Sequence, residues 1–480
     1  MTTTSSHSTG INTSALEELR SVVRGPVLTP DDDGFDDART VFNAMIDRRP
    51  AIICQCVDAA DVIEAVRLAR NEELILSVRG GGHSGPGYGT NDGGLVVDLS
   101  AMRHVVVDLA AERAIVGGGA TWGDVDHATA PFGRAVPAGV ISTTGVGGLA
   151  LGGGSGHLTR AFGLTCDSLI GADVVTADGQ LVHASEHDHP ELFWALRGGG
   201  GNFGVVISFE FRLHQVGTVL GGPIVYDARA AKELLGFYRD YMHEAPMDLG
   251  AFFGFHLAPP LPFVAEEHHG MPVCLIVVCW PGDVNEGREV IRPLLDLDSF
   301  VGSGVDAMPL ATLNSASDAL APPGLHNYYR GHFIEDLTDD VIEVHARHGV
   351  TVPTVSSAVH LYPVDGAAAK VAPHDTAFSH REAHYSTAIA AIWEHPADSH
   401  RNVQWVREYW AALQAVAPGG GYVNFLADDQ GTDDVRAAYR DNYERLAAVK
   451  LAYDPHNLFR MNQNIAPAST DPEAGAARTS

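Results

Sequence analysis

The stretch Leu74–Gly89, LILSVRGGGHSGPGYG, joins an apolar run to a row of three glycines. The apolar run ends at Val78, and the string RGGGHS (79–84) follows it directly. A short apolar run closed by glycines is typical of a buried strand that enters a tight turn. Glycine tolerates positive φ and close approach, so such a turn can wrap its N–H groups around a phosphate. The stretch is neither a Walker loop nor a G-x-G-x-x-G fingerprint that opens a helix. The alternative is a plain strand-to-turn connection with a surface histidine.

A second glycine cluster runs from Gly145 to Gly156 and holds seven glycines. This density does not suit a regular helix or strand, and the interleaved Val, Leu and Ala do not suit a solvated linker. We therefore predict backbone that lies against something flat or charged, with a flexible loop as the alternative.

Composition narrows the possible partners and the compartment. The chain has 480 residues and a net charge of −29, which disfavours nucleic acid and anionic membranes as partners. The five cysteines are an odd number without a Cys-x-x-Cys pair, and the histidines show no metal-ligand spacing, so we expect neither a disulfide framework nor a metal site. The N-terminal residues do not resemble a secretory signal. Together these features predict a cytoplasmic protein.

The pattern along the chain predicts two folded parts between two tails. Up to about Leu213, short apolar strands alternate with helices such as the one that ends at Arg70. From about Val216 to Leu426, strand-like runs such as FFGFHL and STAIAAIW alternate with longer helices, which predicts an antiparallel sheet covered by helices. The chain is then expected to be helical from about Thr432 to Val449.

Several segments, in order, resemble one flavoprotein family. RGGGHS is similar to the flavin-attachment loop of the berberine bridge enzyme-like branch of the vanillyl-alcohol oxidase type flavoproteins, and the sequence is most similar to the bacterial 6-hydroxy-nicotine oxidase-like members. The resemblance implies an α+β fold: a two-part, PCMH-type FAD-binding domain with an inserted antiparallel-sheet substrate domain. The expected division is a disordered tail 1–14, the FAD-binding domain 15–215, the substrate-binding domain 216–431, a C-terminal segment 432–466 that returns to the FAD domain, and a tail 467–480. Further matching segments are PAGVISTTGVGGLALGGGSGH (137–157), GLTCDSLIGADVVTADG (163–179), FWALRGGGGNFGVV (193–206), GYVNF (421–425) and YDPHNLFRMNQNI (453–465).

The same resemblance implies that FAD is bonded through its 8α-methyl group to His83; a histidine that is merely hydrogen-bonded is the alternative. Many relatives add a cysteinyl bond from a segment A-G-x-C-P-T, but here Ile141 stands at the cysteine's place. We therefore expect one covalent bond and interpret Cys166 as a packed thiol near the cofactor. The residues expected to line the FAD are Val78, Arg79, Gly80, Gly81, Gly82, His83, Ser84, Pro137, Gly139, Ser142, Thr143, Thr144, Gly147, Gly148, Gly153, Gly156, Asn202, Gly204, Val206, Asn462 and Asn464.

For catalysis, the resemblance points to Tyr422, which in relatives lies over the flavin and can act as a base. Tyr422 and Asn424 are two apart on an apparent strand, so we expect both to face the same way. A tyrosine with an ordinary pKa near 10 needs a nearby charge or donor, for which Arg381 is the candidate, with Tyr385 as a second pocket tyrosine. Tyr422 as an interface aromatic is the alternative. His360 and Tyr362 also share a strand face, where we favour a structural role.

These features predict an FAD-dependent oxidase that passes hydride from a small alcohol, sugar or cyclic amine to FAD and then to O2, giving H2O2. Thr144 matches a position that gates oxygen in relatives, and its size favours an oxidase. The alternatives are a dehydrogenase with another acceptor, a flavin-binding protein with a vestigial site, and an NADPH-dependent reductase of the same fold. The sequence leaves open whether the protein is a monomer or a homo-oligomer.

Overall fold

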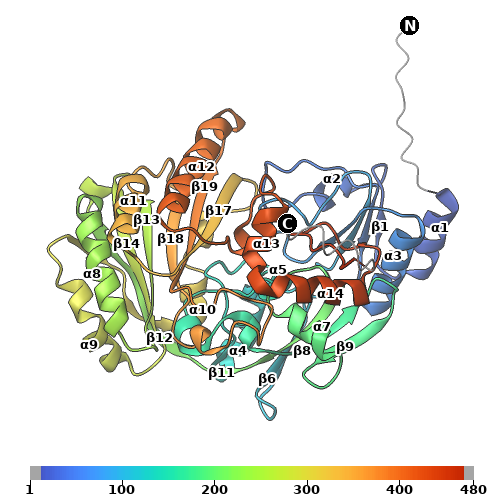
Figure 1. Ribbon diagram of the computed structural model, residues 1–480, viewed down its shortest axis with the longest axis horizontal. Coiled ribbons are helices and arrows are strands. Elements are labelled where there is room, and N and C mark those ends of the chain that lie inside the picture. The colour runs from blue at the N-terminus through green and yellow to red at the C-terminus, as the bar shows by residue number, and fades with distance from the viewer. Residues whose placement is uncertain (1–11, 470–480) are drawn as a thin grey trace, which may run out of the picture.

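The computed structural model describes residues 12–469, which form two parts side by side (Figure 1). Strands β1 to β11 belong to the sheets of one part, and β12 to β19 form a separate eight-stranded sheet. The C-terminal helices return to the first part. The expected α+β fold, with an antiparallel sheet inserted into a second folded part, is confirmed. The division at the expected residue numbers stays a prediction.

The first sheet has the order β1-β2-β4-β3 and carries the first glycine loop. Strands β2, β4 and β3 are parallel, and helices α1 and α3 pack against them. Helix α3 begins where it does because the Asp58 side chain accepts the N–H groups of Ala60 and Asp61. The bounds are α1 (Thr13–Val22), β1 (Val27–Leu28), α2 (Phe35–Ala38), β2 (Ile52–Gln55), α3 (Ala59–Asn71), β3 (Leu76–Arg79) and β4 (Leu95–Asp98).

The second sheet is antiparallel, in the order β5-β6-β10-β8-β9, and packs against α4, α5 and α7. Thr121 caps the N-terminus of α4 in a capping box with Asp124. A two-stranded pair, β7 with β11, completes this part. The bounds are β5 (Val105–Asp108), β6 (Arg113–Gly117), α4 (Trp122–Thr129), β7 (Arg134–Ala135), α5 (Val146–Leu151), α6 (Thr159–Phe162), β8 (Leu169–Val175), β9 (Leu181–Ser185), α7 (Pro190–Leu196), β10 (Val205–Arg212) and β11 (His214–Gln215).

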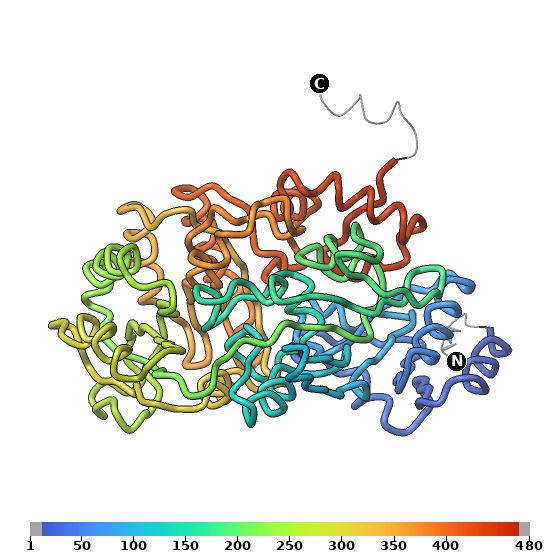
Figure 2. The backbone as a smooth tube through the Cα atoms, turned by 90° about the horizontal axis from the view of Figure 1, so that it is seen from below, coloured from blue at the N-terminus to red at the C-terminus, as the bar shows by residue number. Residues whose placement is uncertain are grey.

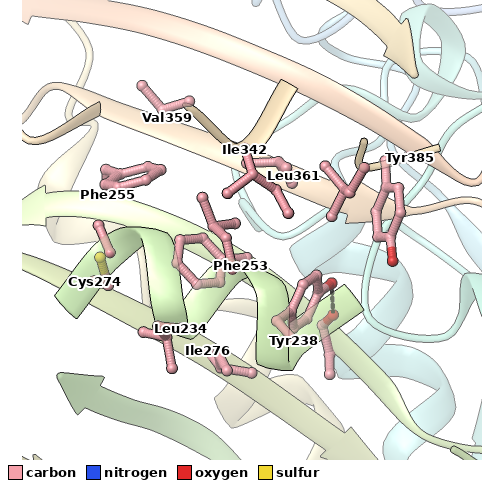
Figure 3. Close-up of a cluster of buried hydrophobic side chains, with 14 of the residues drawn as sticks. Leu234, Tyr238, Phe253, Phe255, Cys274, Ile276, Ile342, Val359, Leu361 and Tyr385 are labelled. Carbon is pink, nitrogen blue, oxygen red and sulfur yellow. Dashed lines mark hydrogen bonds between the residues drawn. The ribbon is translucent and has the colours of Figure 1, made fainter. Parts of the chain in front are cut away.

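The eight-stranded sheet has the order β15-β12-β14-β13-β18-β19-β17, with β16 also paired to β12. One face is covered by α8, α9, α11 and α12 over a large apolar core, part of which is drawn in Figure 3. Strands β13, β14, β18 and β19 send alternate side chains into this core. The bounds are β12 (Thr218–Asp227), α8 (Ala231–Glu244), β13 (Gly250–Leu257), β14 (Pro272–Trp280), α9 (Val284–Leu295), β15 (Phe300–Ser303), β16 (Asp306–Pro309), α10 (Leu310–Asn314), β17 (His326–Ile334), α11 (Asp339–Gly349), β18 (Ala358–Pro363), β19 (Tyr385–Trp393) and α12 (Ser399–Val416).

The C-terminal segment, α13 (Thr432–Tyr439) and α14 (Tyr443–Tyr453), lies beside α7 of the first part (Figure 2). It is fastened by Lys450, whose buried ammonium group pairs with Asp454 at 2.6 Å. The same group donates to the carbonyl oxygens of Asn202 and Phe459 at 2.7 and 2.8 Å. A buried charge with all its donors used holds the returning segment in one position.

Three sequence expectations about local structure need correction. The second glycine cluster does contain a short helix, α5, because Val146, Ala150 and Leu151 are anchored in the core. Tyr422 precedes a 3-10 turn, η8 (Val423–Phe425), and is not on a strand. The predicted tails are shorter, since α1 begins at Thr13 and the N–H of Ala468 donates to Ala447. The remaining tail residues, 1–11 and 470–480, lie outside the described part.

Within residues 12–469, no helix has the length and apolarity needed to cross a membrane. The same residues hold no group of three or more His, Cys, Asp or Glu placed to bind a metal ion.

Candidate active site

A cavity of about 460 Å³ lies between the two parts of the molecule. Its floor, as we call the side formed by loops of the first part and the C-terminal segment, is mostly backbone and apolar. Its roof is the sheet face opposite the helix-covered core, together with residues 317–321 and the turn at Tyr422. The floor residues include Val78–Ser84, Gly139–Ile141, Thr144–Gly145, Gly147–Leu149, Gly200–Asn202, Gly204, Val206 and Met461–Gln463, and the roof residues include His256, Ser317, Leu320, Ala321, Tyr329, Ser356, Ala358, His360, Tyr362, Ala388, Ala390, Ile392, Tyr422, Asn424 and Phe425.

The first glycine loop presents backbone donors to the cavity. The four successive N–H groups of residues 81–84 have no acceptor in the described part of the chain. Gly82 has a φ of +69°, a conformation that glycine adopts without strain. Arg79 does not aim its charge into the cavity, because its guanidinium pairs with buried Asp98 at 2.6 Å and donates to Thr40 and Ala38 carbonyls. The loop therefore offers a ready-made anion cradle made of backbone alone.

The two glycine loops touch each other. A Cβ on Gly81 would lie 2.4 Å from the amide nitrogen of Gly145, and a Cβ on Gly145 would lie 2.4 Å from that of Gly81. Cβ atoms do not approach other atoms this closely, so both positions need glycine. A Cβ on Gly148, which lines the cavity, would meet no protein atom of the described chain within 4 Å and would point into open space. The floor is thus a flat backbone surface. Side chains at these glycine positions would either collide with the neighbouring loop or occupy the cavity.

His83 lies at the end of the cradle with its ring held on one side by Phe42, at 3.9 Å between ring centroids. Its Nε2 is 3.0 Å from the hydroxyl oxygen of Thr143, while Nδ1 has no partner among the described residues. Burial lowers the pKa of His83 to about 4, with nearby Asp318 opposing the shift. The imidazole is therefore neutral at physiological pH and keeps a free ring nitrogen.

At the far end of the floor, Asn202 fastens the C-terminal segment. Its Nδ2 donates to Gly199 and Gln463 carbonyls, and its Oδ1 accepts the N–H of Ile465 at 3.0 Å. Asn462 lines the cavity and leaves its buried Oδ1 without a partner in the described chain. An orphaned acceptor there leaves room for a donor on a bound molecule.

Six of the predicted cofactor residues do not line the cavity. Thr143 holds His83, and Ser142 donates its N–H and hydroxyl to Asp318 at 2.9 and 2.5 Å. Gly156 donates its N–H to Thr159. The six residues that do not line the cavity are Pro137, Ser142, Thr143, Gly153, Gly156 and Asn464. The other predicted cofactor residues do line it.

Tyr422 reaches the cavity, but within the described chain its hydroxyl contacts only donors. The N–H of Gly154 lies 2.7 Å and Nδ2 of Asn424 lies 2.9 Å from the phenolic oxygen. The Asn424 amide is fixed in this orientation because Nδ2 also donates to the Leu149 carbonyl at 3.2 Å. Burial raises the pKa of Tyr422 although both donors lower it. Tyr422 is therefore protonated, and its own proton has no acceptor among residues 12–469.

The two other predicted catalytic residues are elsewhere. Arg381 is buried and pairs with Asp167 at 2.7 and 2.9 Å, so its charge is already compensated, and it does not line the cavity. Tyr385 lies in the helix-covered core, 6.0 Å from Tyr238 between ring centroids (Figure 3). The reason is strand alternation, since Tyr385 has the same parity on β19 as buried Ile389. The structure thus places neither side chain in the cavity.

His360 and Tyr362, for which the sequence favours a structural role, line the roof instead. Sequence reasoning also missed His256, Tyr329 and Phe42. The alternation in FFGFHL and SSAVHLYPV contains the signal for His256, His360 and Tyr362, but which face meets the cofactor depends on the helices that cover the other face. No comparable signal marks Phe42 or Tyr329.

None of the five cysteines lines the cavity. Cys166 is fully buried beside Tyr422 and Phe378 and does not line the cavity. Burial raises its pKa, which disfavours the reactive thiolate. Ile141, in contrast, does line the cavity.

The residues present fit FAD. The backbone donors of residues 81–84 suit a pyrophosphate, the glycine floor suits a flat ring system, and the neutral His83 stands at its edge.

Known proteins agree with this interpretation. The FAD binding domain family model matches residues 50–185, and the "Berberine and berberine like" model matches residues 421–466. The chain is 32% identical over 459 residues to (R)-6-hydroxynicotine oxidase of Paenarthrobacter nicotinovorans, covering 93% of this chain and 97% of that protein. It is 29% identical over 465 residues to chitooligosaccharide oxidase of Gibberella zeae, covering 89% of each.

Among solved structures, 6-hydroxy-D-nicotine oxidase of Arthrobacter nicotinovorans superimposes with a TM-score of 0.82 at 31% identity, covering 93% of this chain and 98% of that one. The matched models, the full-length relatives and the shared fold lead to one conclusion: the chain belongs to the berberine bridge enzyme-like family of FAD-linked oxidoreductases.

Proposed function

We propose that this FAD-linked oxidoreductase is an oxidase that removes a hydride from a small, uncharged organic substrate and passes the electrons to O2, giving H2O2. The observation that carries the proposal is the meeting, in one cavity, of a backbone floor suited to FAD and a roof that bears hydroxyl and imidazole groups. When bound, FAD supplies the hydride acceptor and the route of electrons to oxygen.

The charge of the cavity wall supports an uncharged substrate. Among the described lining residues, Arg79 is the only Asp, Glu, Lys or Arg, and Asp98 already neutralises it. With the N–H groups of residues 81–84 taken by the pyrophosphate of FAD, a carboxylate or ammonium group of the substrate would lose hydration without gaining a charged partner, which is costly. Alcohols, sugars and amines in their neutral form fit this wall. The oxidases of 6-hydroxynicotine and of chitooligosaccharides among the relatives are consistent with both nitrogen and hydroxyl substrates.

His83 is proposed as the sole covalent attachment point, bonded through Nδ1 to the flavin 8α-methyl carbon. Support comes from the contact of Nε2 with Thr143, which leaves Nδ1 as the free nitrogen, and from the lowered pKa that keeps the ring neutral. A cysteinyl bond has no support, because Ile141 lines the cavity and Cys166 does not.

Oxygen is proposed as the electron acceptor. Thr144 lines the cavity on the floor, at the position that the family resemblance associates with access of oxygen. A dehydrogenase that uses another acceptor is the competing hypothesis, and the reoxidation experiment below separates the two.

We also propose a reducing compartment, such as the cytoplasm. All five cysteines are free and buried, and the sulfur atoms of Cys54 and Cys56 lie 3.7 Å apart without a disulfide bond.

The test is anaerobic titration of the holoenzyme with three sets of neutral compounds: simple alcohols, oligosaccharides and cyclic amines. An oxidase should lose its flavin absorbance with at least one compound and regain it rapidly in air, with one H2O2 formed per substrate. Slow reoxidation in air with fast reoxidation by a quinone would favour the dehydrogenase. No bleaching by any compound would contradict catalysis, and bleaching by NADPH alone would point to a reductase.

A further inference from the structure

Three polar side chains form a continuous chain on the roof. The hydroxyl of Tyr362 lies 2.7 Å from Nδ1 of His360. Nε2 of His360 lies 2.8 Å from Nε2 of His256. All three residues line the cavity, and Nδ1 of His256 has no partner among the described residues. Hydrogen-bonded groups that are each both donor and acceptor can pass a proton from one end to the other.

The sheet makes room for this chain at Gly254. In the pairing of β13 with β18, Gly254 is opposite His360, and His256 is the next residue on the same face. A Cβ on Gly254 would lie 3.0 Å from Cδ2 of His360 and 3.4 Å from Cδ2 of His256. The missing side chain lets the two imidazoles lie beside each other, which a larger residue would prevent.

The direction of the hydrogen bonds distinguishes Tyr362 from Tyr422, two of the tyrosines that line the cavity. When Tyr362 donates to Nδ1 of His360, His360 carries its proton on Nε2 and donates to His256, so every contact has one donor and one acceptor. The phenolic oxygen of Tyr362 then keeps a lone pair for a proton from the cavity. Tyr422, which meets only the donors Gly154 and Asn424 in the described chain, can donate to a substrate oxygen but has nowhere to send its own proton.

We propose that Tyr362, backed by His360 and His256, accepts the hydroxyl proton of the substrate, and that Tyr422 holds the substrate oxygen by a hydrogen bond. This inference rests on the proposed oxidase function with a hydroxyl substrate. The substrate O–H bond breaks and its proton goes to Tyr362, whose proton moves to Nδ1 of His360, whose Nε2 proton moves to His256. The hydrogen of the substrate carbon would leave with its bonding pair as the C=O bond forms, and a bound flavin would supply the acceptor for this hydride.

The protonation states agree with this geometry. Burial lowers the pKa of His256 to about 4, and burial together with the neighbouring His256 and His157 lowers that of His360. Burial also lowers the pKa of His157, whose ring lies 5.7 Å from that of Phe252 between centroids, to about 4. Tyr362, His360 and His256, which we call the relay, are therefore neutral at physiological pH before the reaction. Together they can take up one proton. The substrate proton becomes far more acidic as the hydride leaves, so a weak base suffices.

The decisive variants are Tyr362→Phe and Tyr422→Phe, compared by anaerobic stopped-flow measurement of flavin reduction with a hydroxyl substrate. Tyr362→Phe should lower the limiting rate by about 10²- to 10⁴-fold, the usual contribution of a positioned base, with substrate affinity near that of wild type. Tyr422→Phe should chiefly weaken substrate affinity. Tyr385→Phe removes a hydroxyl from the buried face of the same sheet and is the matched control, with rates as in wild type.

His360→Asn tests the relay behind Tyr362, because an amide can still contact the hydroxyl but cannot carry a proton onward. It should lower the limiting rate, and adding Tyr362→Phe should cost little more, since residues that act as a unit are not additive. A rate near wild type in Tyr362→Phe, a larger rate loss in Tyr422→Phe, or additive losses would overturn the relay.

A readout without turnover comes from histidine-selective ¹⁵N NMR of the holoenzyme. The relay predicts a neutral His256 down to about pH 5, and a shift of the His360 Nδ1 resonance in Tyr362→Phe that is absent in Tyr422→Phe. An unchanged Nδ1 resonance would contradict the chain. Failure of the proposed function is distinct: no hydroxyl compound would then bleach wild-type flavin, whereas failure of the relay leaves wild-type bleaching intact and Tyr362→Phe unimpaired.

Discussion

The floor and the roof of the cavity are built on different principles. The floor is backbone: its contacts depend on the absence of side chains at Gly81 and Gly145, and its donors are main-chain N–H groups. The roof is side chains from β13, β17, β18 and β19, which project at every second position. Changes in the floor should therefore decide whether the cofactor binds, and changes in the roof should decide which substrate reacts and how fast.

The largest effect is expected for Gly81→Ala in the floor. The new Cβ would lie 2.4 Å from the Gly145 nitrogen, and backbone cannot move aside as a side chain can. We expect almost no flavin in the purified variant, measured as flavin absorbance per chain. Gly236→Ala is the control, since its Cβ meets nothing within 4 Å in helix α8. Full flavin content in Gly81→Ala would show that this part of the floor does not control cofactor binding, and would contradict the difference expected between floor and roof.

Gly254→Ala is the corresponding change in the roof. Its Cβ presses on His360 at 3.0 Å, so we expect normal flavin content but flavin reduction slowed by roughly 10- to 100-fold, a fraction of the contribution of a base. Flavin content and the reduction rate are measured on the same sample. Loss of flavin from this variant would show that the roof also governs cofactor binding.

The contact between the two parts should respond to pH through Asp126. This buried carboxyl on α4 accepts a hydrogen bond from Asn314 of α10 at 2.9 Å, and burial raises its pKa from 3.8 to about 6. Folding then favours the protonated form, so this group lowers stability as pH rises from about 4 to 6, and the loss persists above that range.

Asp126→Asn removes this penalty. We expect the variant to gain about 1–3 kcal/mol of unfolding free energy at pH 8 and almost nothing at pH 4, as judged from denaturant unfolding at both values. Equal effects at the two pH values, or destabilisation at pH 8, would contradict the assignment.

A smaller effect is expected for Thr143→Val, which removes the hydroxyl that holds Nε2 of His83 but keeps the shape. The fraction of flavin bound covalently should fall severalfold while total flavin stays near wild type, because the floor itself is unchanged. Thr143→Ser keeps the hydroxyl and should restore covalent binding. If valine and serine behave alike, the contact with Thr143 plays no part in attachment.

The same contrast explains what can be predicted from the sequence. Glycine clusters can be recognised in a sequence because so many glycines in a short stretch do not suit a regular helix, a strand or a solvated linker. The floor and its loop at His83 are therefore predictable without knowledge of the fold. The helices α3, α4 and α11 are predictable from their apolar spacing and from their caps at Asp58, Thr121 and Thr338.

The roof is harder to predict because alternation alone does not say which face of a strand meets the cofactor. Tyr385 and Tyr362 are both tyrosines on central strands, yet one is in the core and the other in the cavity. Arg381 shows a second limit: its partner Asp167 is 214 positions away in the chain, so the ion pair could not be foreseen.

The most direct test of the account is the intact mass and colour of acid-denatured wild-type protein beside His83→Ala. We predict that yellow colour stays with the wild-type chain, with the mass of one FAD added, and that the variant chain has neither. Covalent flavin in His83→Ala would place the bond on another residue, and free flavin released from the wild type would contradict attachment at His83.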